Sequence, residues 1–308
     1  MSQIVQIKSP VLAAVTDQIG YVEARNQAEK LSQEHGLTVA DMPMVIQAMT
    51  AHPEVREAIR STWIDTITGE YHGQRDGDRS YETWHSAGSL ATAKGLEKLF
   101  SKAGDYAFMQ ISDDEWVAVG KGSYNGQTVA RVHLDDAKKG NVPSAGTPYT
   151  IFARLDKDSP KINGRGQLDY DTFMQDDRVL MITGSPESRE ALAKMLFGKK
   201  EDGGEGWSNI GSYHRINEIG FDAKAKGRLA FLGNDISGLV GYDGISNLGR
   251  FVVGGAGGAV AREKSAPQSI VQPTLEQTLA VINNPDLNRE GMLKAVYQLY
   301  NRCICLAI

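Results

Sequence analysis

The sequence contains few cysteines and no long apolar run, and these absences exclude two classes of protein. Its two cysteines, Cys303 and Cys305, are separated by one residue, a spacing too short for an unstrained disulfide between them. We therefore expect no disulfide framework of the kind that stabilises small secreted domains. No segment approaches the roughly 20 apolar residues of a membrane-spanning helix, and the first residues do not resemble a signal peptide. These features predict a soluble protein of the cytoplasm, or of the host cytoplasm if the source is a virus.

A strong basic charge is also absent. The 308 residues carry a formal net charge of -5 and no long basic run, whereas non-specific nucleic-acid binders carry a basic stripe. The net charge therefore does not indicate nucleic acid as a partner. The sequence does contain 41% hydrophobic residues, enough for a core, and 33 glycines, which favour many turns and close backbone approaches.

The hydrophobic pattern along the chain predicts an α+β fold with three regions. Residues 1–103 are expected to form a helical region. Residues 104–262 are expected to form a glycine-rich, mainly antiparallel β region with a covering helix and one β-turn-α unit. Residues 263–308 are expected to close the chain with a helical pair and an apolar tail. The same pattern is compatible with one single domain.

Capping residues and apolar spacing predict four helices in the first region. A polar, glycine-rich loop over 68–80 is expected to precede the last of them. The four helices are expected to begin at Ser9-Pro10, Asp41, Pro53 and Tyr81, and the first is expected to end at Gly36.

In the second region the apolar period changes to two, which predicts strands. A meander of three strands is expected over 105–111, 115–124 and 127–134, with Asn125-Gly126 as the turn between the last two. In the third of these strands Val129, Arg131 and His133 share one half-polar face. Further strands are expected over 147–156, 227–233, 237–244 and 249–255.

Residues 178–198 are predicted to form the β-turn-α unit, with a buried strand, a tight turn and a helix. The turn places Gly184, Ser185 and Ser188 at a helix N-terminus, where backbone N–H groups and the helix dipole favour an anion. Helix capping explains the same residues, because Ser185 is a natural N-cap and proline follows it. We favour the capping interpretation and keep the anion site as an alternative.

Arg79 and His85 enclose the segment "SYETW" in a region predicted to be helical. This spacing resembles the R-x(4-6)-H signature of HEPN-type ribonucleases. The resemblance implies that the pair acts on the 2′-hydroxyl and the scissile phosphate of RNA. Such roles suit the two side chains, because histidine titrates near neutral pH and arginine binds phosphate. The alternative is an arginine at a helix start and a partly buried, hydrogen-bonded histidine.

Other residues that serve metal or nucleotide chemistry occur without the spacing this chemistry needs. His72, Asp76, Asp78 and His85 surround one loop, but they match neither a calcium loop nor a zinc motif, so we predict no metal site. Glycines in 251–261 resemble part of a dinucleotide-binding loop, but no second strand with a terminal acidic residue follows. No motif identifies a cofactor. Three acidic pairs are interpreted as turn residues at strand ends: Asp113-Asp114, Asp135-Asp136 and Asp176-Asp177.

The sequence leaves three hypotheses for function, and it does not decide whether the chain is an enzyme. The first is an assembly or interaction protein that binds a protein partner or forms a homo-oligomer. The second is an enzyme or sensor for a nucleotide or RNA phosphate, which acts through Arg79 and His85 or through the helix N-terminus at Gly184. The third is a lipid-anchored effector, because Cys305 begins a C-terminal pattern that resembles a prenylation signal. We place the first hypothesis ahead of the other two.

Overall fold

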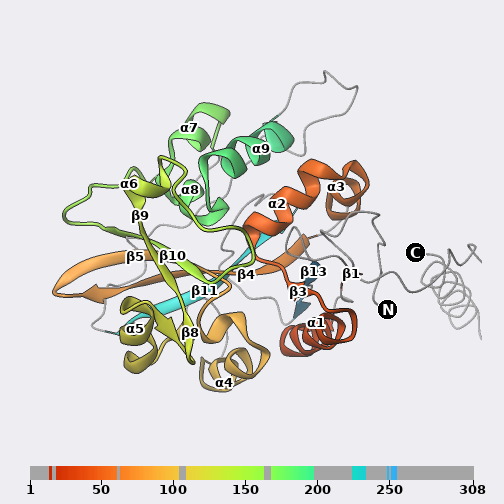
Figure 1. Ribbon diagram of the computed structural model, residues 1–308, viewed down its shortest axis with the longest axis horizontal. Helices are drawn as coiled ribbons and strands as arrows, with labels where there is room; N and C mark the ends of the chain where they lie inside the picture. The colour runs from red at the N-terminus through yellow and green to blue at the C-terminus, as the bar shows by residue number, and fades with distance from the viewer. Residues whose placement is uncertain are drawn as a thin grey trace, which may run out of the picture.

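The centre of the molecule is a six-stranded, mainly antiparallel sheet. The structure is a computed structural model that describes residues 14–15, 19–60, 63–103, 109–162, 168–197, 224–233, 248–249 and 251–254. Among the described strands of this sheet, only β10 and β9 pair in parallel. In spatial order its strands are β6 (Met109–Gln110), β11 (Lys226–Gly233), β4 (Trp63–Arg75), β5 (Asp78–His85), β10 (Tyr149–Arg154) and β9 (Ala130–His133). The predicted α+β fold is confirmed (Figure 1).

The longest feature of the sheet is the hairpin formed by β4 and β5. Asp76 and Gly77 connect the two strands, and both have a positive φ, 54° and 84°, as a two-residue hairpin turn of type I′ requires. The predicted loop over 68–80 is therefore wrong, and the helix predicted from Tyr81 begins too early, because residues 81–85 belong to β5 and the helix α4 spans Ala93–Ala103. Buried polar residues concealed the strand period, because Thr68 and Glu70 are fully buried on the same strand face.

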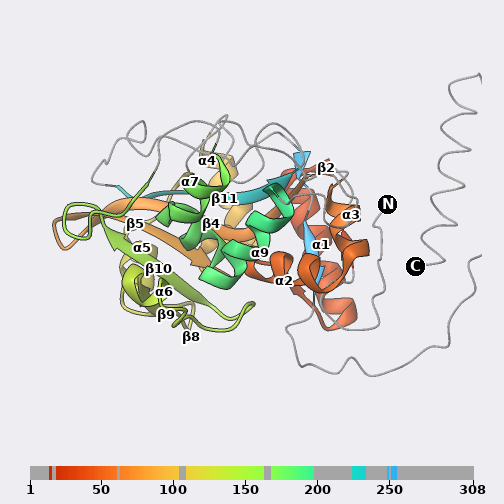
Figure 2. The same cartoon turned by 90° about the horizontal axis from the view of Figure 1, so that it is seen from above.

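Helices cover both faces of the sheet (Figure 1 and Figure 2). On one face, called face A, lie α2 (Met42–Ala51), α3 (Pro53–Arg60), α6 (Leu134–Ala137), α7 (Tyr170–Gln175), α8 (Asp177–Thr183) and α9 (Pro186–Phe197). On the opposite face, called face B, lie α1 (Tyr21–His35), the 3-10 turn η1 (Ser89–Ala91), α4 (Ala93–Ala103) and α5 (Asp113–Gly120). Apolar clusters fill both interfaces, with Ile64 and Leu232 in the first and Tyr71 and Trp84 in the second.

The start of the chain differs from the prediction. Val15 and Ile19 do not continue a helix from Ser9-Pro10, because they lie in β1 (Ala14–Val15) and β2 (Ile19–Gly20). These strands pair with β13 (Val252–Gly254) and β12 (Leu248–Gly249), and β13 also pairs with β3 (Thr38–Val39). Pairing with partners so distant in the sequence overrides the local helical pattern. The expected helix stop at Gly36, with φ 65°, and the helix starts at Asp41 and Pro53 are confirmed.

The predicted three-stranded meander is wrong, because its first strand, β6, pairs with β11, its last, β9, pairs in parallel with β10, and its middle segment is largely helical. Residues 115–120 belong to α5, which Ser112 caps by accepting a hydrogen bond from the Glu115 N–H at 3.3 Å. The turn at Asn125-Gly126 is confirmed, because it joins β7 (Ser123–Tyr124) to β8 (Gln127–Thr128). The strands expected over 147–156, 227–233 and 249–255 are represented by β10, β11 and β12–β13. Residues 237–244 and 263–308 lie outside the described residues.

The predicted β-turn-α unit is instead a helix, a turn and a second helix. The apolar run after Arg178 forms α8, which is buried on every side, so it shows neither a strand nor a helix period. Asp176 caps α8 by accepting hydrogen bonds from the Arg178 and Val179 N–H groups. The acidic pairs thus stand at helix starts and not at strand ends: Asp113-Asp114 in α5, Asp135-Asp136 in α6 and Asp176-Asp177 in α8.

Candidate functional site

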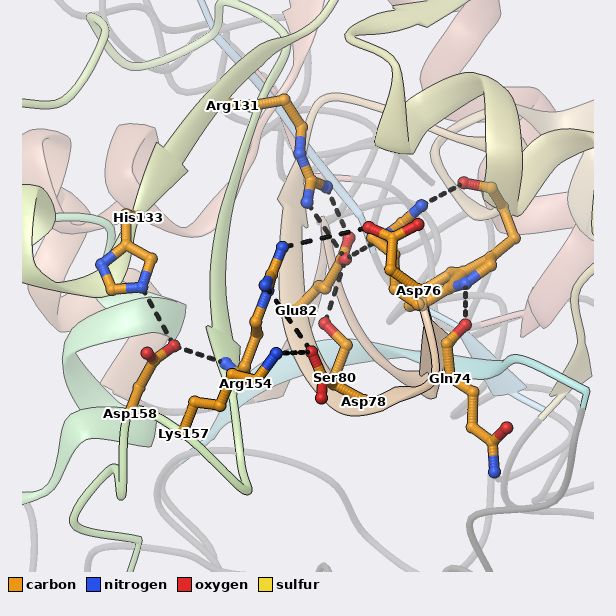
Figure 3. A network of polar contacts seen from close by, with 12 residues as sticks. Gln74, Asp76, Asp78, Ser80, Glu82, Arg131, His133, Arg154, Lys157 and Asp158 are labelled. Carbon is orange, nitrogen blue, oxygen red and sulfur yellow. Dashed lines mark hydrogen bonds and ion pairs between the residues drawn. The ribbon is translucent and has the colours of Figure 1, made fainter.

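Five side chains gather on face B over the strands β5, β10 and β9. We call Glu82, Arg131, His133, Phe152 and Arg154 the platform. The register places them side by side. Phe152 of β10 pairs with Glu82 of β5 on one side and with His133 of β9 on the other. Arg154 lies two residues after Phe152 on β10, and Arg131 lies two residues before His133 on β9. Glu82 is fully buried, whereas the other four are half-buried, so the platform is an accessible part of face B. Figure 3 shows Glu82, Arg131, His133 and Arg154 of the platform with their polar contacts.

Glu82 is the buried hydrogen-bond acceptor at the base of the platform. Its carboxylate accepts hydrogen bonds from Arg75 Nε at 2.7 Å, Arg131 Nη1 at 2.8 Å and Trp84 Nε1 at 2.8 Å. Ser80 Oγ and Arg131 Nη2 donate two further hydrogen bonds, at 3.2 Å and 3.3 Å. Burial alone would raise the pKa of Glu82, but the charges of Arg131 and Arg75 outweigh it and lower the pKa. Glu82 is therefore a fixed anion whose two oxygens are occupied.

Both arginines bound to Glu82 also lie over aromatic rings. The Arg131 Cζ atom is 4.3 Å from the centroid of the Phe152 ring, and Arg75 Cζ is 4.1 Å from that of Trp116. Stacking and charge-assisted hydrogen bonds together hold the planar guanidinium groups in one orientation. Gly120 makes room for Arg75, because a Cβ atom there would lie 1.7 Å from Arg75 Nη1.

A turn after β10 completes the outer edge of the platform. Asp158 Oδ2 accepts hydrogen bonds from the Arg154 N–H at 2.6 Å and from His133 Nε2 at 2.9 Å. His133 Nδ1 accepts the Asp135 N–H at 3.2 Å, which assigns the proton of the neutral ring to Nε2. Both ring nitrogens of His133 are thus engaged, and its ring meets Phe152 edge-on.

The structure does not bring Arg79 and His85 together. They stand near opposite ends of strand β5, and six strand residues span about 20 Å. Arg79 is half-exposed and paired with Asp156. His85 is fully buried, where its ring nitrogens contact Thr68 Oγ1 at 3.1 Å and the Met181 carbonyl at 2.9 Å. Burial lowers the pKa of His85 to about 3, so it is neutral at physiological pH. The helical setting expected for this pair is wrong.

The other predicted site residues lie apart from the platform. Gly184 ends α8 with φ 85°, and Ser185 Oγ accepts the Ser188 N–H at 3.1 Å, as the capping interpretation expects. An anion site there stays a prediction. Among the described residues no group of three or more acidic, histidine or cysteine side chains is placed to hold a metal ion. Cys303, Cys305 and the glycines from Gly255 onward lie outside the described residues.

A second buried carboxylate, Glu70, lies on face A. It accepts hydrogen bonds from Arg178 Nε at 2.6 Å, Arg228 Nε at 2.8 Å and the Tyr81 hydroxyl at 2.7 Å. Burial opposes its ionisation, but Arg178 and Arg228 hold the pKa of Glu70 well below its usual value. All four side chains are buried, so this cluster joins β4, β5, β11 and α8 within the core and presents nothing to a ligand.

Sequence reasoning found one sign of the platform, the half-polar face of Arg131 and His133. It missed Glu82 because residues 78–85 were predicted as loop and helix, and it missed Phe152 and Arg154 because their position between β5 and β9 follows only from the order of strands in the sheet. A strand assignment for residues 78–85 would have placed Ser80, Glu82 and Trp84 on one face by their period of two. That alternation of polar residues is the signal that was available.

Comparison with known proteins supports the fold and carries no information on activity. No family model matches the chain, and no curated protein is detectably similar to it. A solved structure, described as the accommodation of massive sequence variation in Nanoarchaeota by the C-type lectin fold, superposes with a TM-score of 0.55 at 16% identity. The match covers 80% of this chain and 99% of that one. The chain thus shares the C-type lectin-like α+β architecture. None of the helices in the described part of the chain has the length and apolar character of a membrane span.

Proposed function

We propose that the chain is an interaction protein that binds a protein partner through the platform. The observation that carries this proposal is the setting of Phe152. It is a half-buried aromatic residue between Glu82 and His133, with the Arg131 guanidinium stacked over its ring. Aromatic and arginine side chains are enriched among the residues that contribute most to protein–protein binding. Fixed orientations add to this, because an ordered side chain loses little entropy on binding.

The state of the polar groups favours recognition over catalysis. A general base needs a free lone pair within reach of the substrate proton. His133 uses both ring nitrogens within the protein, and both oxygens of Glu82 are hydrogen-bonded. The platform therefore offers shape, an aromatic surface and cationic donors, and these are the features of a binding surface.

The fold comparison is consistent with this proposal. The Nanoarchaeota structure is described as accommodating massive sequence variation. A fold that accommodates varied sequences suits a protein that uses surface side chains for recognition. A narrower form of the proposal is that the partner is a second copy of this chain, so that the protein forms a homo-oligomer.

Site-specific photo-crosslinking in the native cells tests the proposal. A benzophenone amino acid replaces Phe152 in one variant and Tyr170 in a control variant. Tyr170 lies on α7, on the face A side, and is 40% exposed, so both variants carry the probe at an accessible aromatic position. We expect an adduct of defined mass from position 152 and none from position 170. A second copy of the chain in the adduct would establish self-association, whereas adducts from position 170 alone would overturn the proposal.

A further inference from the structure

We infer that the partner presents a carboxylate to the guanidinium group of Arg154, an inference that rests on the proposed function. The Arg154 side chain is 38% exposed at the edge of the platform. Its Nη1 is 3.6 Å from Asp78 Oδ2, and its Nη2 is 3.9 Å from Asp76 Oδ2. Both separations exceed hydrogen-bond distance. Within the described residues, the guanidinium of Arg154 thus forms ion pairs with these two aspartates but no hydrogen bond to the protein.

The neighbouring arginines differ from Arg154 in this respect. Arg75 and Arg131 are hydrogen-bonded to Glu82, and Arg79 is hydrogen-bonded to Asp156. Asp78, the nearer acid to Arg154, forms its short contact with Lys157 Nζ, at 2.7 Å. Figure 3 shows Arg154 reaching between Asp76 and Asp78 from strand β10. Of the platform's two arginines, Arg154 is thus the one that can bind an added acceptor without breaking a hydrogen bond to the protein.

The surroundings of Arg154 favour a carboxylate over a phosphate. A guanidinium group offers parallel N–H donors that match both anions. The site is ringed by Asp76, Asp78 and Asp158, so a dianionic phosphate is repelled more strongly than a singly charged carboxylate. Phe152 is the next residue on the same strand face, and it adds an apolar contact beside the charge. An acidic side chain with an apolar neighbour, on a protein surface, fits this combination.

The backbone at Arg154 is already ordered for binding. Its N–H donates to Asp158 Oδ2 at 2.6 Å, and the residue pairs with Ser80 of β5. Only the side chain has to be ordered when a carboxylate binds, which lowers the entropic cost of binding.

Titration followed by NMR of the arginine Nε–Hε resonances tests the inference on the full chain. The probe is the blocked tripeptide acetyl-Gly-Glu-Gly-amide, with acetyl-Gly-Gln-Gly-amide and inorganic phosphate as comparison ligands. The Arg154→Lys variant assigns the resonance. We expect a saturable shift at Arg154 with the glutamate peptide and none at Arg79. An equal shift with the glutamine peptide, a tighter response to phosphate, or no shift at Arg154 would overturn the carboxylate assignment.

The partner captured at position 152 separates this inference from the proposed function. We expect the Arg154→Met variant, which keeps an unbranched apolar stem but removes the guanidinium, to weaken binding of that partner by at least about tenfold, as loss of a charge-assisted hydrogen bond implies. An unchanged affinity would reject the carboxylate while leaving the platform as the binding surface. Absence of any adduct from position 152 would instead reject the platform itself.

Discussion

Arg131 reaches across a whole strand to meet Glu82. The two residues belong to β9 and β5, and β10 lies between these strands in the sheet. Arg131 Nη1 nevertheless lies 2.8 Å from Glu82 Oε2, and its guanidinium passes over the ring of Phe152 on β10. One contact thus orders three neighbouring strands and sets the shape of the surface that we propose binds a partner.

Removal of the Glu82 charge is expected to destabilise the protein. In Glu82→Gln the guanidinium groups of Arg75 and Arg131 lose the carboxylate that neutralises them in a largely desolvated position. We expect the free energy of unfolding to fall by about 3 kcal/mol, measured by urea denaturation. Asp156→Asn is the matched control, because it breaks an exposed ion pair with Arg79 and should change stability far less. Equal effects of the two variants would contradict the anchoring role of Glu82.

Gly120 is expected to be required for the position of Arg75. Alanine is the better helix former, so helix propensity alone predicts that Gly120→Ala in α5 stabilises the protein. The added Cβ would lie 1.7 Å from Arg75 Nη1, and the guanidinium would have to leave its place beside Glu82 and Trp116. We therefore expect a loss of about 1–2 kcal/mol in urea denaturation. A gain in stability would show that Arg75 moves without cost.

Gly184 is expected to resist substitution for two separate reasons. Its φ of 85° is unfavourable for other residues, and a Cβ atom would lie 2.5 Å from the Tyr149 hydroxyl and 2.6 Å from Pro43 Cγ. Gly184→Ala should lower the free energy of unfolding by about 2–4 kcal/mol. Gly126→Ala is the control, because Gly126 has a φ of 78° but no atom within 4 Å of the added Cβ. The difference between the two variants measures the clash alone, and a difference near zero would contradict the packing.

Stability is expected to fall in mild acid because of two buried histidines. Burial lowers the pKa of His72 and of His85 to about 3. In the unfolded chain the pKa of histidine is about 6.5, so the unfolded state binds the protons first as the pH falls. The stability due to these groups is therefore complete above pH 6.5 and is lost as the pH falls towards 3. At pH 5 the loss is roughly 2 kcal/mol for each histidine.

Urea midpoints measured at pH 7.5 and pH 5 check this prediction. The His72→Gln variant keeps His85 and should show about half of the acid-induced loss. Burial raises the pKa of Asp41, so this group acts with the opposite sign, and the Asp41→Asn background removes its contribution. A urea midpoint that does not change between the two pH values would contradict the buried, neutral state of the histidines.

Local signals predicted those parts of the fold that local interactions determine. Asp41, Gly36 and Asn125-Gly126 each stand at the helix start, helix stop or hairpin turn that their chemistry predicts. Helix α8 was mistaken for a strand because burial on all sides removes the period that separates the two structures. The β4–β5 hairpin was missed because Glu70 and Glu82, which read as surface residues, are buried with arginine partners from distant segments.

The platform could not be predicted in full, because it depends on contacts between strands that are distant in the sequence. Arg131 and His133 were visible as a half-polar face of one strand, but their partners on β5 and β10 follow only from the order of strands in the sheet. Arg79 and His85 are the opposite case, because residues predicted to share a site lie far apart. Their spacing suggested a shared site on a helix, whereas a strand carries the two side chains about 20 Å apart.

The affinity of the partner captured at position 152 is the measurement that tests the central claim most directly. Phe152→Ala and Tyr170→Ala remove aromatic rings from the platform and from α7, respectively, and both variants are compared with the unaltered chain in the same binding isotherm. We predict a loss of at least about tenfold for Phe152→Ala, as expected for an interface hot spot, and no change for Tyr170→Ala. Unchanged affinity in Phe152→Ala would contradict the account and place the binding surface elsewhere on the molecule.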